Sequence, residues 1–231
     1  MEPLVLIPGT LCTSALWEHQ YRSFSADREV IIPDITRDAS VKEMAERILN
    51  SVSGSFSLVG LSLGGIVAME VMKEAPERVN KLALLDTNPY PPTKEQIELW
   101  NNQQKQVRAG GFEQMISEQF LPSAVFQEHA GEGVKAVIRQ MSRDVGEEGY
   151  FRQLEANKTR PGAVDALSAV NCPSLVLAGR QDALCGPSMQ EDLAKKIPGA
   201  ALVLIDQCGH LSPLDQPEAV TSVLSYWLQE N

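Results

Sequence analysis

A serine between two glycines is the residue in this chain most suited to act as a nucleophile. Residues 60–64 read Gly-Leu-Ser-Leu-Gly, with Ser62 at the centre. The apolar run at 56–59 predicts a buried strand before this pentapeptide, and the apolar stretch at 66–72 predicts a helix after it. A serine on the sharp turn between strand and helix is held in a strained conformation that exposes its hydroxyl. The N-terminus of the helix would favour negative charge beside that hydroxyl.

The pentapeptide also has a purely structural interpretation, a glycine-rich turn whose serine caps the following helix. Gly60 and Gly64 suit both interpretations, because a Cβ atom at either position would collide where strand and helix approach each other. A nucleophilic serine needs two further groups, a base within hydrogen-bond reach and a carboxylate that orients the base. The other residues of the chain therefore decide between the interpretations.

The chain has only three histidines, so the search for a base is short. His19 falls in a predicted first helix, and His129 falls in a long helical stretch. His210 follows the apolar run at 201–205, in a loop at the carboxyl end of a predicted strand. The carboxyl ends of parallel strands share one edge of a sheet, so we predict that His210 is the base for Ser62. The alternative is an ordinary surface histidine.

Two aspartates at strand ends compete for the role of the orienting acid. Asp182 follows the predicted strand at 174–178, and Asp86 follows the strand at 81–85. Asp182 is favoured because one helix and one strand separate it from His210, and because serine, acid and base then follow one another in the order expected for this architecture. The acidic residues nearest to the histidine in sequence are interpreted as loop or capping residues: Asp206 and Asp215.

Acyl transfer also needs hydrogen-bond donors for the oxyanion of the tetrahedral intermediate. We predict that the backbone N–H of Leu63, directly after the serine, is one donor. The second would be the N–H of Thr10, in the loop that follows the first predicted strand. A glycine-containing loop is expected there in any parallel sheet, so this loop alone does not specify a function.

Six short apolar runs predict the strands that position these residues. Most are continuously apolar, as expected for strands covered on both faces in a parallel sheet. Helical patterns alternate with them, including one after the capping box Ser40-x-x-Glu43 and one from Pro217 to about Gln229. The alternation predicts an α/β fold with a doubly wound, mostly parallel sheet of about six strands. The runs lie at 4–7, 29–32, 56–60, 81–85, 174–178 and 201–205.

One long segment, residues 89–168, contains amphipathic helical patterns and no convincing strand. It lies between the fourth and fifth predicted strands, so we expect a cap over the carboxyl ends of the strands, where open α/β sheets bind ligands. A helical appendage unrelated to the site is the alternative. The predicted division is a core of residues 1–88 and 169–231 with a cap of residues 89–168. The predicted cap helices lie at 93–109, 112–120, 133–145 and 147–158.

Ser62, Asp182 and His210, in this order and each at a carboxyl strand end, resemble the active site of the α/β-hydrolase fold family. The resemblance covers nearly the whole chain, and the chain is similar to small capped, cofactor-free esterases related to pimeloyl-acyl-carrier-protein methyl ester esterase. It implies hydrolysis of a small-molecule carboxylic ester through an acyl-enzyme on Ser62, without metal or organic cofactor. Cleavage of a lactone, thioester or carbon–carbon bond, a lyase with the same triad, or a sensor without turnover are the alternatives.

The sequence departs from this family in two places. Many members have His-Gly where this chain has Pro8–Gly9, and proline cannot make the hydrogen bonds of a histidine. The chain also starts at the strand before this loop, without the two preceding strands of larger members. The strand at 29–32 should then form a sheet edge, and exposed edges invite pairing. A homodimer through this edge is a hypothesis that light scattering can test.

The composition of the chain excludes some classes of binding partner. The formal charge of the 231 residues is −10, which argues against nucleic acid and anionic membranes as partners. No apolar run approaches 18 residues, so no membrane span is expected, and the N-terminus does not read as a signal peptide. The cysteines show no Cys-x-x-Cys spacing that would predict zinc, and we expect reduced thiols in a cytoplasmic protein. The four cysteines are Cys12, Cys172, Cys185 and Cys208.

Several arginines in the predicted cap stand out in an acidic protein. We interpret them as part of a solvated helix face. If one of them faced the pocket, it would suit a substrate carboxylate or a carrier phosphate. They are Arg139, Arg143, Arg152 and Arg160.

Overall fold

A computed structural model describes residues 2–128 and 130–229 of the protein. Within these residues, six parallel strands form one sheet in the order β2-β1-β3-β4-β5-β6. The predicted fold class is confirmed, and the second predicted strand lies at a sheet edge as expected. The strands are β1 (Leu4–Ile7), β2 (Val30–Ile31), β3 (Phe56–Leu61), β4 (Val79–Leu85), β5 (Ser174–Gly179) and β6 (Ala201–Ile205).

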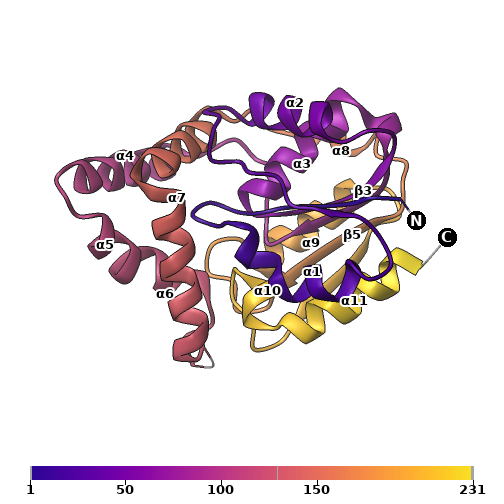
Figure 1. Ribbon diagram of the computed structural model, residues 1–231. Coiled ribbons are helices and arrows are strands. Elements are labelled where there is room, and N and C mark those ends of the chain that lie inside the picture. The colour runs from indigo at the N-terminus through magenta and orange to yellow at the C-terminus, as the bar shows by residue number, and fades with distance from the viewer. Residues whose placement is uncertain (1, 129, 230–231) are drawn as a thin grey trace.

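Helices cover both faces of the sheet (Figure 1). One face carries α2 (Val41–Ser51), α3 (Leu63–Glu74), α8 (Val164–Leu167) and α9 (Pro187–Lys196). The other carries a 3-10 turn (Ser14–Trp17), α1 (Glu18–Phe24), α10 (Ser212–Asp215) and α11 (Pro217–Gln229). A second 3-10 turn (Pro76–Arg78) leads into β4.

The continuous apolar runs follow from this two-sided cover. In β1, Leu4 and Leu6 belong to the core under α1 and α11, whereas Val5 and Ile7 belong to the core under α2 and α3. Successive side chains of a strand point to opposite faces, so both sets must be apolar. The strand at the second edge, β6, is only half-buried to exposed along its length.

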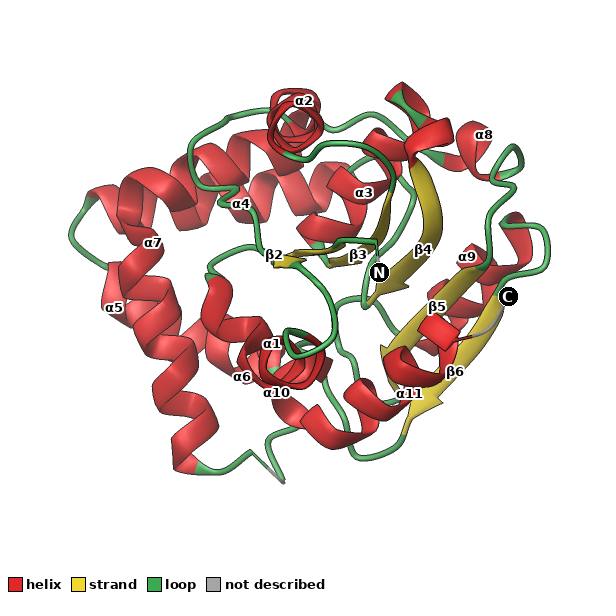
Figure 2. Ribbon diagram, turned by 45° about the vertical axis from the view of Figure 1, so that its right-hand side comes forward, coloured by secondary structure: helices red, strands yellow, loops and turns green. Residues whose placement is uncertain are grey.

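The segment between β4 and β5 is helical and stands beside the carboxyl ends of the strands (Figures 1 and 2). Its longest helix is interrupted at Gly146, whose φ of 67° and ψ of 173° are not helical, and this kink separates the two predicted helices there. Apolar residues of the segment form a cluster of their own with Leu11 from the core. The elements are α4 (Lys94–Arg108), α5 (Phe112–Met115), a π-helical stretch (Ile116–Phe120), α6 (Leu121–Ala124) and α7 (Glu132–Thr159).

We refer to the part of this segment from α4 to α7 as the cap, since α8 packs on the core. None of the helices that the structure describes combines the length and the apolar character needed to cross a membrane.

Candidate active site

Ser62 occupies the turn between β3 and α3 in a strained conformation, with φ of 55° and ψ of −117°. At this turn the backbone segments approach so closely that Gly60 and Gly64 have no room for a Cβ atom. A Cβ atom at Gly60 would lie 2.2 Å from the carbonyl oxygen of Gly64, and one at Gly64 would lie 2.4 Å from the carbonyl oxygens of Ile7 and Pro8. Gly60 is therefore required where β3 meets α3, as the sequence predicted, whereas Gly64 is required where α3 meets the end of β1.

Backbone hydrogen bonds hold the serine in this conformation. The N–H of Ser62 donates to the carbonyl of Leu85 (2.9 Å), and its carbonyl accepts from the N–H of Ile66 (3.1 Å). The same carbonyl accepts from the hydroxyl of Thr87 (2.7 Å), a contact that no motif in the sequence indicated. These bonds use the backbone groups of the turn and leave the Ser62 hydroxyl directed away from strand and helix.

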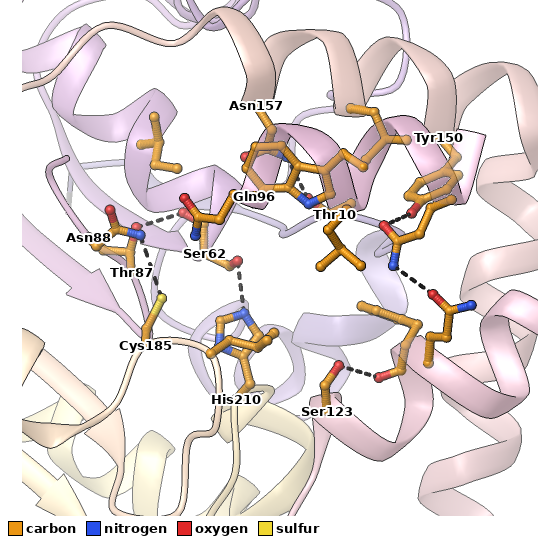
Figure 3. A pocket seen from close by; sticks show the side chains of 18 of the residues that line it. Thr10, Ser62, Thr87, Asn88, Gln96, Ser123, Tyr150, Asn157, Cys185 and His210 are labelled. Atoms are coloured by element: carbon orange, nitrogen blue, oxygen red, sulfur yellow. Dashed lines mark hydrogen bonds between the residues drawn. The ribbon is translucent and has the colours of Figure 1, made fainter. Parts of the chain in front are cut away.

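The imidazole of His210 joins the serine to an aspartate. Its Nε2 lies 2.8 Å from Ser62 Oγ (Figure 3), and its Nδ1 lies 2.9 Å from Asp182 Oδ2. A carboxylate can only accept, so Nδ1–H donates to Asp182 and the lone pair of Nε2 faces the serine hydroxyl. The structure thus brings together the three residues that the sequence predicted, from the ends of β3, β5 and β6.

The environment of the pair sets the charges of both groups. Burial opposes charging of His210, but the Asp182 charge and hydrogen bond outweigh it and raise the pKa of His210 above its ordinary value of 6.5. Burial alone would raise the pKa of Asp182. The charge and hydrogen bond of His210 outweigh burial, together with the N–H groups of Leu184 and Cys185, and lower this pKa below 3.8. Asp182 is therefore ionised at neutral pH, and the imidazolium form of His210 is stabilised by it.

The loop that carries His210 is fixed on both sides. Asp215 Oδ2 accepts from the backbone N–H of Gly209, the residue before His210 (2.6 Å), and from the backbone N–H of Phe126 in the cap (2.8 Å). Asp206 forms an exposed ion pair with Arg180. Both aspartates are therefore structural residues of the loop, as predicted.

Asp86, the competing candidate for the acid, has other partners. Its carboxylate accepts from the N–H of Gly179 (2.9 Å) and from the hydroxyl of Ser212, and it forms no hydrogen bond with His210. It is fully buried, and burial, with the nearby charge of Asp182, raises its pKa well above 3.8. Asp86 thus ties β4 to β5 and to the start of α10, while Asp182 contacts the imidazole.

The predicted oxyanion donors, Thr10 and Leu63, flank the serine in the structure. Neither backbone N–H makes a hydrogen bond within the described residues. The loop of Thr10 is held by α7 of the cap: Gln153 Oε1 accepts from the N–H of Leu11 (2.9 Å), and Asn157 Nδ2 donates to Thr10 Oγ1 (3.2 Å). Sequence reasoning missed these two cap residues, since nothing local marks them.

A cavity of about 370 Å³ lies between the sheet edge and the cap. Ser62, His210 and Thr10 line it together with other residues of the core, and residues of the cap complete the lining (Figure 3). On the cap side, apolar side chains alternate with amide, hydroxyl and guanidinium groups: Leu99, Trp100, Met115, Phe120, Leu154, Gln96, Gln103, Gln119, Ser123, Tyr150, Asn157 and Arg160. An apolar cavity with a few polar groups is typical of a small-molecule site.

Of the four cap arginines, three fit the predicted solvated face. Arg139 and Arg143 form ion pairs with Glu132 and Glu113, respectively, and Arg152 pairs with Glu148. For Arg160 this interpretation is wrong. It is only 5% exposed and lines the cavity, because the chain leaves α7 there and turns back toward the core.

His19 and the cysteine thiols form no hydrogen bond with Ser62, Asp182 or His210. His19 lies in α1 and contacts Thr221 (2.8 Å), and His129 falls outside the described residues. The four cysteines are free thiols. Cys185 lies with Asp182 and His210 in the one close group of potential metal ligands found among the described residues. The aspartate and histidine are already bonded to each other, which explains this group without a metal.

The chain is similar to known proteins in sequence and in fold. The model of the family described as "Alpha/beta hydrolase family" matches residues 4–223. A pimeloyl-[acyl-carrier protein] methyl ester esterase from Nitrosomonas europaea is 27% identical, over 95% of this chain and 92% of that protein. A thermophilic esterase from Thermogutta terrifontis, solved with malate bound, is 30% identical and superposes with a TM-score of 0.91 over 99% of this chain and 90% of its own.

A third relative, an (E)-2-((N-methylformamido)methylene)succinate hydrolase from Acinetobacter baylyi, is 22% identical over 99% of this chain and 90% of that protein. Two of these relatives are named as esterases and the third as a hydrolase. The family model covers almost the entire chain, and the fold superposes on that of the Thermogutta terrifontis esterase. The protein is therefore an enzyme of the alpha/beta hydrolase family.

Proposed function

We propose that the protein is a serine hydrolase that cleaves a small-molecule carboxylic ester through an acyl-enzyme on Ser62. The observation that carries this proposal is the 2.8 Å contact between His210 Nε2 and Ser62 Oγ, beside the cavity. A serine hydroxyl is a weak nucleophile until a base can take its proton, and the imidazole is within the distance that proton transfer requires.

The reaction has two steps. As Ser62 Oγ attacks the ester carbonyl, His210 takes its proton, and the resulting imidazolium is stabilised by Asp182. His210 then gives the proton to the departing alcohol, which leaves the acyl group on Ser62. Water, activated by the same imidazole, releases the acid. This mechanism needs neither a metal nor an organic cofactor.

The oxyanion of each tetrahedral intermediate would be bound by the backbone N–H groups of Leu63 and Thr10. Both are without hydrogen-bond partners among the described residues, and Leu63 begins α3, whose N-terminus favours negative charge. Donors fixed before the reaction stabilise the developing charge without reorganisation. Each such donor contributes about 3 kcal/mol to lowering the barrier in comparable enzymes.

The relatives favour an ester over the other bonds that this triad could cleave. The Nitrosomonas europaea protein is a methyl ester esterase, and the Thermogutta terrifontis protein is an esterase. A lactone, thioester or carbon–carbon bond remains the second candidate, because the same acyl-enzyme chemistry would serve. A small-molecule sensor on the hydrolase scaffold is disfavoured by the intact set of Ser62, Asp182 and His210.

The proposal is tested with a fluorophosphonate probe and a p-nitrophenyl ester of a short acid. We expect the probe to label Ser62, and Ser62→Ala to abolish labelling and lower kcat/KM by at least about 10³-fold. Ser222→Ala, which removes an exposed hydroxyl on α11, serves as the control and should keep full activity. Near-normal turnover by Ser62→Ala would refute the assignment, and tight ligand binding without labelling would favour a sensor.

A further inference from the structure

Arg160 is a buried cation at the edge of the active-site cavity. It directly follows α7, its side chain is 5% exposed, and it lines the same cavity as Ser62. Burial lowers the pKa of the guanidinium below its ordinary value, but the group remains charged at neutral pH.

The partners of this guanidinium are all neutral. Its Nε donates to the carbonyl of Tyr90 (3.1 Å), and its Nη1 donates to Oδ1 and the carbonyl of Asn157 (2.9 and 3.4 Å). The group also lies over the ring of Trp100, at 5.5 Å from the centroid. Arg160 forms no ion pair with any described residue, and its Nη2 has no hydrogen-bond partner among them.

A buried charge without a counter-charge is unusual, because the loss of hydration must be offset by an opposite charge. The cavity does not supply one. Among the described residues that line it, Arg160 alone carries a permanent charge, and no aspartate or glutamate is present. The protein as a whole is strongly acidic. The positive charge of Arg160 therefore distinguishes the cavity from the rest of the protein.

The position of Arg160 links it to the reaction centre. Asn157, which accepts from its Nη1, donates through Nδ2 to the hydroxyl of Thr10 (3.2 Å), in the loop proposed to bind the oxyanion. Two hydrogen bonds, both made by the Asn157 side chain, therefore connect the guanidinium to this loop. A substrate whose ester carbonyl lies at Ser62 could direct a second group toward Arg160 inside one cavity.

We propose that Arg160 binds a free carboxylate on the substrate, so that the enzyme prefers esters that carry a second, ionised carboxyl group. The planar guanidinium suits a carboxylate, which would supply the missing counter-charge and accept from Nη2. This inference rests on the proposed ester hydrolysis at Ser62. It adds the substrate class: half-esters of short dicarboxylic acids, or acyl esters of short hydroxy acids.

The test compares each carboxylate ester with its carboxamide analogue, which has nearly the same shape but no charge. One pair is monomethyl adipate and its carboxamide, and the other is an acetylated hydroxybutanoate and its carboxamide. For the wild type we expect kcat/KM to favour the carboxylate by about 10- to 100-fold in at least one pair, the range of a charge-assisted hydrogen bond in a buried site.

Variants separate the charge from the packing of the side chain. Arg160→Gln should reduce the preference to about one, while kcat/KM for the carboxamide changes by less than about tenfold. Arg160→Lys retains the charge without the planar fork and should keep an intermediate preference. Arg143→Gln is the matched control, because it removes the same charge from the exposed ion pair with Glu113 and should leave the preference unchanged.

Equal rates within both pairs for the wild type, or an unchanged preference in Arg160→Gln, would overturn the inference. Binding of the same esters to Ser62→Ala, measured by calorimetry, gives a readout that does not depend on turnover. At least tenfold tighter binding of a carboxylate ester supports the inference, and equal binding overturns it. If the wild type hydrolyses no ester, the proposed function fails, and this binding experiment still decides whether the cavity prefers a carboxylate. If Arg160→Gln does not fold, Arg160→Lys takes its place in the comparison.

Discussion

The side chain of Gln153, in α7 of the cap, accepts a hydrogen bond of 2.9 Å from the backbone N–H of Leu11, in the loop after β1. Leu11 has a φ of 57°, which is rare for a residue with a branched side chain, and its side chain packs into the apolar cluster of the cap. The cap thus holds the loop that bears Thr10 through contacts that do not involve Pro8.

Replacing Gln153 should therefore impair catalysis as well as stability. In Gln153→Leu the N–H of Leu11 loses its buried acceptor, which costs about 1–3 kcal/mol of unfolding free energy. Displacement of the Thr10 N–H should lower kcat by about tenfold or more with little change in KM, because the oxyanion exists only after the serine attacks. Steady-state kinetics and urea unfolding measure the two effects.

Gln140→Leu is a suitable control, because Gln140 lies on the exposed side of the same helix and bonds only to Asp144. It should have wild-type kcat. A Gln153→Leu enzyme with unchanged kcat would show that the cap does not position the Thr10 loop.

The two buried aspartates should respond differently to conversion to asparagine. In Asp182→Asn the imidazole loses its charged partner and can adopt the wrong tautomer, so kcat/KM should fall by about 10³- to 10⁴-fold. In Asp86→Asn the amide oxygen can still accept from Gly179, and the amide nitrogen can donate to Ser212. Because burial already favours the neutral carboxyl of Asp86, we expect kcat/KM within about tenfold of the wild type.

Kinetics of the two variants with one p-nitrophenyl ester, together with circular dichroism to verify folding, make this comparison. A larger loss in Asp86→Asn than in Asp182→Asn would assign the acid to the end of β4 instead of β5.

The activity should fall on the acid side at a pH above 6.5. The charge of Asp182 raises the pKa of His210 above that ordinary value, and the free enzyme is active only with His210 neutral. As the pH falls through the raised pKa, the imidazole gains a proton and can no longer take one from Ser62. A profile of kcat/KM for an uncharged ester gives the midpoint directly, and a midpoint below 6.5 in the wild type would contradict the expected influence of Asp182.

The same pKa shift predicts a dependence of stability on pH. Because the folded-state pKa of His210 is higher than in the unfolded chain, its ion pair with Asp182 stabilises the fold fully below pH 6.5, and this contribution is lost as the pH rises through the raised pKa. Asp182 acts in the opposite direction, since its lowered pKa gives stability above 3.8 that is lost on further acidification. The unfolding free energy attributable to the pair should therefore be largest between about pH 4 and 6.5.

Local patterns were enough to predict the nucleophilic turn and the strands. Gly60, Ser62 and Gly64 lie within one pentapeptide, and the clash that a Cβ atom at Gly60 would make is with Gly64 of the same segment. The clash at Gly64 is with Ile7 and Pro8, at the end of the neighbouring strand, and only the tertiary structure shows it. The continuous apolar runs predicted the strands of the sheet, because strands covered on both faces must be apolar at every position. His210 followed from its place after the last strand, where chain order and parallel pairing bring it to the edge that bears the serine.

Contacts between distant segments were decided only by the tertiary structure. Asp86 and Asp182 both follow parallel strands, and only the packing of the loops shows which carboxylate contacts His210. The inward position of Arg160 and the bonds from Gln153 and Asn157 to the loop after β1 depend on how the cap docks. Hydrophobic periodicity identifies the apolar face of a helix. It does not specify which polar side chain bonds to which residue when the two are more than a hundred positions apart in the sequence.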